Sequence, residues 1–75
     1  MKNGTEKMAA LMAGPVYLDG DEIAVRTEPG ENWEGIKWFA KLKGGKEFPT
    51  EPSAKNVFDA RNAWNEITAE KYKAF

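Results

Sequence analysis

The chain contains no cysteine and no histidine, and its only serine is Ser53. Without cysteine it forms no disulfide, which fits a reducing compartment such as the cytoplasm. Without histidine it lacks the commonest general base and a usual zinc ligand, and Ser53 has no imidazole partner for a Ser-His-Asp triad. We therefore expect no enzyme activity, no catalytic residue, no metal site and no cofactor.

Long apolar runs are also missing. No segment approaches the roughly 20 apolar residues of a membrane-spanning helix, and the run Met8–Met12 is too short for a secretory signal. We therefore expect a cytoplasmic protein without a membrane partner.

Carboxylates are the remaining groups that could support acid–base chemistry or bind calcium. The segment Asp19–Glu22 has calcium-loop composition, but an EF-hand loop starting at Asp19 needs glycine at position 6 and glutamate at position 12. Those positions hold Ala24 and Gly30. The pattern favours turn residues over a metal site.

What the chain does contain is typical of a small folded protein. Of its 75 residues, 41% are hydrophobic and 12% are aromatic, which favours a single domain, 1–75, with a dense core. The pattern predicts an α+β fold: a short N-terminal helix, a three- to four-stranded antiparallel meander, and a C-terminal amphipathic helix packed on the sheet.

The N-terminal helix is expected over Glu6–Ala13, with Thr5 as its cap and Gly14 as its stop. Asp19-Gly20 then favours a two-residue type I′ turn, because both central positions of that turn need positive φ. Pairing around this turn places four apolar side chains on one face: Val16, Leu18, Ile23 and Val25.

The third strand is expected to begin at Trp33 or Gly35 and to end at Leu42. Alternation assigns these residues to the core face: Ile36, Trp38, Ala40 and Leu42. It assigns these to the other face: Lys37, Phe39, Lys41 and Lys43. The N-terminal helix is one candidate to cover Phe39. After a turn at Gly44-Gly45, a short strand over Lys46–Phe48 is ended by Pro49.

The C-terminal helix is expected to be capped by Thr50 or Ser53. Its apolar stripe comprises Val57, Ala60, Trp64 and Ile67, so Trp64 is expected in the core. Thr68 is expected to start a separate short turn over Ala69–Phe75.

Charge is unevenly distributed along the chain, although its net value is −1. The stretch from Asp19 to Glu34 carries six acids and one base, and the stretch from Lys37 to Lys46 carries four lysines and no acid. An aromatic among lysines, next to an acidic segment, is typical of a binding surface that steers a partner. The candidate partner-binding residues are Lys37, Phe39, Lys41, Lys43, Lys46, Asp19, Asp21 and Glu22.

The order of strand, glycine turn, strand and capped helix over Gly35–Ile67 resembles, in architecture, sheet-reading DNA-binding modules. Integrase arm-binding domains and the plant ethylene-response-factor domain are examples. The resemblance implies nucleic-acid binding by the sheet. Those families are rich in arginine on the sheet, whereas this sheet carries only Arg26.

The leading hypothesis is a non-enzymatic protein-binding module, such as a small regulator or inhibitor of a larger machine, of the size common among phage and mobile-element proteins. The alternative is nucleic-acid binding through the lysine strand and Phe39. A third hypothesis is a structural or assembly protein that forms homo-oligomers through an exposed strand edge.

Overall fold

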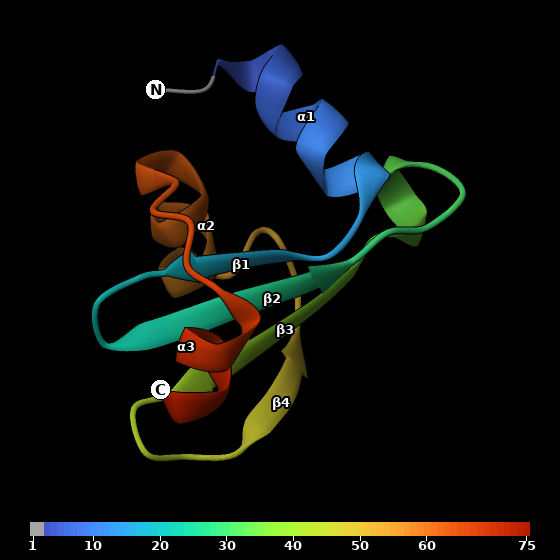
Figure 1. The fold of residues 1–75 in the computed structure, drawn as a ribbon. Coiled ribbons are helices and arrows are strands. Elements are labelled where there is room, and N and C mark those ends of the chain that lie inside the picture. Colours follow the sequence, from blue (N-terminus) through green and yellow to red (C-terminus); the bar gives the residue numbers. More distant parts are fainter. Residues whose placement is uncertain (1–2) are drawn as a thin grey trace.

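The expected α+β architecture is present in the computed structural model, which describes residues 3–75 (Figure 1). Four antiparallel strands form one sheet in the order β1-β2-β3-β4. The elements, in chain order, are α1 (Gly4–Ala13), β1 (Val16–Asp19), β2 (Ile23–Glu28), the 3-10 turn η1 (Trp33–Gly35), β3 (Lys37–Leu42), β4 (Glu47–Thr50), α2 (Lys55–Ala63) and α3 (Ala69–Ala74).

The hydrophobic core lies on one face of the sheet, beneath α1 and α2. Leu11 of α1 and Val57 of α2 are almost fully buried there, against Leu18 and Val25 of the sheet. Trp38 and Trp64 belong to the same cluster and are 4% and 8% exposed, which confirms the prediction that both lie in the core. Because α1 packs on this face, it does not cover Phe39, which points to the opposite side.

The second face of the sheet is covered in part by α3. Tyr72 is 3% exposed, and its ring centroid lies 5.5 Å from that of Tyr17 on β1. The Thr68 side chain accepts a hydrogen bond from the Lys71 amide, which confirms the expected separate start of this last element. The sheet is therefore sandwiched between unequal helical layers (Figure 1).

Two of the expected helix caps are wrong. Asn3, rather than Thr5, caps α1, because its side chain accepts from the Glu6 amide while the Glu6 side chain accepts from the Asn3 amide. The α2 helix begins after Ala54 and has no side-chain cap, so neither Thr50 nor Ser53 fills that role.

The first hairpin has a longer loop than Asp19-Gly20 predicts. The observed register sets Val16 opposite Thr27 and Asp19 opposite Ala24, and the positive φ falls on Asp21, at 74°. The Val16 amide donates to the buried Thr27 hydroxyl at 3.2 Å, which favours this register. A two-residue turn at Asp19-Gly20 would set Leu18 opposite Asp21, whereas Leu18 pairs with Val25, four residues further along. Because this shift is an even number of residues, the expected core face is preserved.

The third and fourth strands also differ from their expected ends. Residues Trp33–Gly35 form a 3-10 turn, whose last amide bonds the Asn32 side chain, so β3 starts only at Lys37. Pro49 does not end β4 but lies within it, opposite Phe39. Proline is tolerated in an edge strand because its missing N–H can face solvent.

The α2 helix ends earlier than the apolar stripe suggests. Trp64 adopts a left-handed conformation with φ 52°, which stops the helix after Ala63. The following residues run along β1: the Asp19 amide bonds the Asn65 carbonyl and the Ile67 amide bonds the Tyr17 carbonyl. Ile67 is half-buried in this extended segment. The segment covers the outer edge of β1, whereas among residues 3–75 no strand pairs with the outer edge of β4.

Candidate binding surfaces

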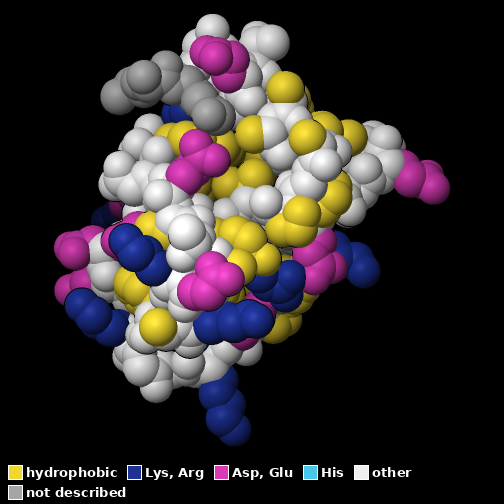
Figure 2. Space-filling model, in the orientation of Figure 1, with side chains coloured by type: hydrophobic (Ala, Val, Ile, Leu, Met, Phe, Trp, Pro, Cys, Tyr) yellow, Lys and Arg dark blue, Asp and Glu magenta, His cyan; other side chains and the backbone are white. Residues whose placement is uncertain are grey.

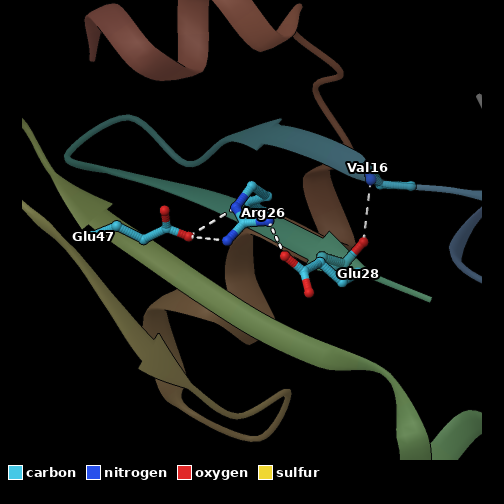
Figure 3. Close-up of polar contacts among 5 residues, drawn as sticks. Val16, Arg26, Glu28 and Glu47 are labelled. Atoms are coloured by element: carbon cyan, nitrogen blue, oxygen red, sulfur yellow. Dashed lines mark hydrogen bonds and ion pairs between the residues drawn. The ribbon is translucent and has the colours of Figure 1, made fainter. Parts of the chain in front are cut away.

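Phe39, the aromatic of the expected binding strand, is half-buried beneath an arginine. The Arg26 guanidinium lies 4.2 Å from the Phe39 ring centroid, on the face opposite the core. Arg26 is itself held between two carboxylates (Figure 3). Its Nε donates to Glu47 on β4 at 2.7 Å, and its Nη1 donates to Glu28 on its own strand at 2.5 Å.

The contacts with Glu28 and Glu47 determine the charge state of Arg26. Partial burial works against the positive charge of Arg26, but the hydrogen bonds to Glu28 and Glu47 outweigh burial and raise its pKa above the usual value. Arg26 therefore stays charged, and its charge is balanced within the molecule rather than offered to a partner.

Two of the candidate lysines make contacts within the chain. Lys41 donates through Nζ to the carbonyls of Tyr72 and Lys73 at 3.3 and 2.8 Å, where it stabilises the C-terminal end of α3. Lys43 lies 6.0 Å from the ring of Phe75. Lys37 and Lys46 are exposed. On this side basic, acidic and apolar side chains are interspersed rather than gathered by type (Figure 2).

The acidic candidates gather at the β1–β2 loop. Asp19 and Asp21 line a cavity of about 440 Å³ together with Asp59 of α2. Glu22 lines a neighbouring hollow of about 160 Å³. Within residues 3–75 no group of three or more acidic side chains is placed to hold a metal ion. The structure thus places the acidic candidates Asp19, Asp21 and Glu22 together around the β1–β2 loop, on a concave surface that does not include Phe39.

A third surface consists of Leu42, Phe48 and Phe58, which we call the apolar patch. Their exposed fractions are 54%, 40% and 48%. Phe48 pairs with the buried Ala40, so Leu42 and Phe48 are diagonal neighbours on the face that carries the core. Their exposure shows that this end of the face is not covered by the helices of residues 3–75.

Phe58 lies on the same side of the sheet, as the contacts of Arg61, one turn further along α2, show. The Arg61 guanidinium lies 5.5 Å from the Trp38 ring and 5.6 Å from the Phe58 ring. Trp38 belongs to β3, so this flank of α2 is turned toward β3 and β4. The main packing of α2 is on β1 and β2. On the far half of this face Trp38 and Ala40 are buried, and the exposed positions are Leu42 at the end of β3 and Phe48 on β4.

Sequence reasoning missed this patch. Alternation assigned Leu42 to the core, because it assumes that a helix covers every strand of the sheet. One feature of the sequence did indicate an exposed apolar surface. Phe58 follows Val57 directly and therefore falls outside the apolar stripe that α2 buries.

We find no match to this chain among protein-family models, curated proteins or solved structures. Within residues 3–75, no helix has the length and apolarity that spanning a bilayer requires.

Proposed function

We propose that the chain is a non-enzymatic protein-binding module and that the apolar patch of Leu42, Phe48 and Phe58 is its contact surface. The observation that carries this proposal is the exposure of three large apolar side chains on one side of the sheet. Exposed aromatic side chains on one side of a molecule are typical anchors of a protein interface.

Lysines border the patch. Lys46 lies in the turn that joins Leu42 to Phe48, and Lys55 lies three residues before Phe58, on the same side of α2. Exposed charge around an apolar centre steers encounter and selects the partner more than it adds affinity. The partner surface that fits is apolar at its centre and acidic at its rim.

The nucleic-acid hypothesis has less support. Arg26, the only arginine on the sheet, is bound by Glu28 and Glu47, and Lys41 is bound by carbonyls of α3. A phosphate backbone would have to compete with these internal contacts. Pro49 in the exposed β4 edge likewise disfavours assembly by strand addition.

Site-specific photo-crosslinking would test the proposal. A photoreactive phenylalanine analogue replaces Phe48 or Phe58, and cross-linked proteins are identified from nuclease-treated lysate. Met8, which is 44% exposed on α1, is the matched control position. We expect one protein to cross-link from both patch positions and not from position 8.

The purified partner then allows a quantitative test. We expect Phe48→Ser and Phe58→Ser each to weaken its binding by about 2 kcal/mol or more, as for interface anchors, and Met8→Ser to leave it unchanged. Equal affinities for all three variants would place the interface elsewhere, with the acidic cavity and Lys37 as the next surfaces to test.

A further inference from the structure

A separate cavity of about 270 Å³ lies between α1 and α2. Figure 2 shows apolar side chains beneath α1, at the top of the molecule. The lining residues combine apolar and cationic side chains, and they are Gly4, Lys7, Met8, Leu11, Trp33, Arg61, Asn62 and Trp64. None of them is acidic, although the chain as a whole has a net charge of −1.

Both cations sit beside the indole rings of the cavity. Lys7 Nζ lies 5.7 Å from the Trp64 ring and donates to the Asn62 carbonyl at 3.2 Å. The Arg61 guanidinium lies 5.6 Å from the Trp33 ring and donates to the Pro52 carbonyl at 2.9 Å. Among residues 3–75 neither cation is paired with a carboxylate, in contrast to Arg26. Each retains donors beyond the one it uses.

Trp64 supplies an independent observation. The residue is 8% exposed, and its Nε1 is buried without a hydrogen-bond partner among the described residues. A buried indole N–H without an acceptor is costly, and native structures rarely leave one. Because Trp64 also lines the cavity, its indole N–H signal would report an occupant directly.

We propose that the cavity between α1 and α2 binds a small amphipathic carboxylate, with its apolar body between Trp33, Leu11 and Trp64 and its carboxylate toward Lys7 and Arg61. A carboxylate is a strong acceptor for both cations that line the cavity. The cavity volume lies near the lower end of small-molecule sites, which fits one ring or short alkyl chain rather than a folded partner. This site is independent of the protein-binding function proposed above.

Titration with phenylbutyrate tests the proposal, because neutral phenylbutanol and cationic phenylbutylamine have the same apolar body. The readout is the assigned indole N–H signals of the three tryptophans in two-dimensional NMR of the full chain. We expect phenylbutyrate to shift the Trp64 signal saturably at millimolar concentrations or below, with the Trp33 signal following. Phenylbutanol should bind about tenfold more weakly, and phenylbutylamine should give no saturable shift.

Variants of Lys7 then test whether its positive charge binds the carboxylate of the ligand. Lys7→Gln should weaken phenylbutyrate about tenfold and Lys7→Arg should restore it, whereas Lys71→Gln, an exposed lysine on α3, should change nothing. The proposal is overturned if phenylbutylamine binds as tightly as phenylbutyrate, if no saturable shift occurs, or if shifts map to the apolar patch instead of Trp64.

Discussion

At the scale of single residues, arginine and aromatic side chains organise both faces of the sheet. Arg61 lies within 5.6 Å of the rings of Trp33, Trp38 and Phe58, and Arg26 stacks on Phe39. Burial of Trp38 and Trp64 could be predicted from their spacing alone. Coverage of Phe39 could not, because it depends on Glu47, which is 21 residues from Arg26 in the chain.

Replacement of Trp64 by alanine should destabilise the fold strongly. The change empties a core site, since Trp64 is 8% exposed and belongs to the central apolar cluster. We expect the free energy of unfolding to fall by about 3–5 kcal/mol in urea denaturation. Phe58→Ala, which trims an aromatic that is 48% exposed, should change it by about 0.5 kcal/mol or less. Similar losses for the two variants would contradict this view of the core.

Tyr72 should make stability depend on pH in the alkaline range. Burial, with the negative charge of Glu47 as a smaller contribution, raises the pKa of Tyr72 from 10.0 to about 12. A pKa raised in the folded state gives stability that is complete below pH 10 and is lost as the pH rises toward 12. Subtracting the pH profile of Tyr72→Phe from that of the parent chain isolates this loss from lysine titration. A difference that is flat over this range would show that Tyr72 ionises without penalty.

At the scale of elements, the sequence predicts which elements form better than where they end. Alternation and helical spacing indicated α1, three or four strands, α2 and a separate short turn where the structure has α3. The first hairpin register was wrong because Asp21, and not Gly20, takes the positive φ. The cap of α2 was wrong because Thr50 remains in β4, paired with Trp38. Local turn and cap rules cannot include such long-range pairing. They therefore gave the wrong turn for the first hairpin and the wrong cap for α2.

Gly30 should be essential for the loop that precedes β3. A Cβ at Gly30 would overlap the carbonyl group of Gly35 and come within 2.7 Å of its Cα, so backbone would have to move. We expect Gly30→Ala to cost about 1–3 kcal/mol or more in thermal or urea unfolding. Gly14→Ala is the matched control, since nothing lies within 4 Å of its added Cβ. Equal stability of the two variants would mean that the η1 loop relaxes without cost.

At the scale of the whole molecule, the helical layers cover the sheet unequally, and this inequality creates the candidate surfaces. The α2 helix packs mainly on β1 and β2, and Leu42 at the end of β3 and Phe48 on β4 stay exposed. The α1 helix buries Leu11, and a cavity remains between it and α2. The lysine and acidic segments were visible in the sequence. The patch and the cavity were not, because both depend on how far each helix reaches over the sheet.

The exposed edge of β4 should be protected from self-association by Pro49. The β1 edge is bonded to residues 65–67, whereas β4 has no strand beyond it among the described residues. Proline at an edge removes a donor that an added strand would need. We expect Pro49→Thr to shift the chain toward dimers or larger species as concentration rises, measured by sedimentation velocity. Pro29→Thr, at an exposed loop position, should sediment like the parent chain. If Pro49→Thr also sediments like the parent at every concentration, the charges and twist of β4, rather than its proline, keep this edge unpaired.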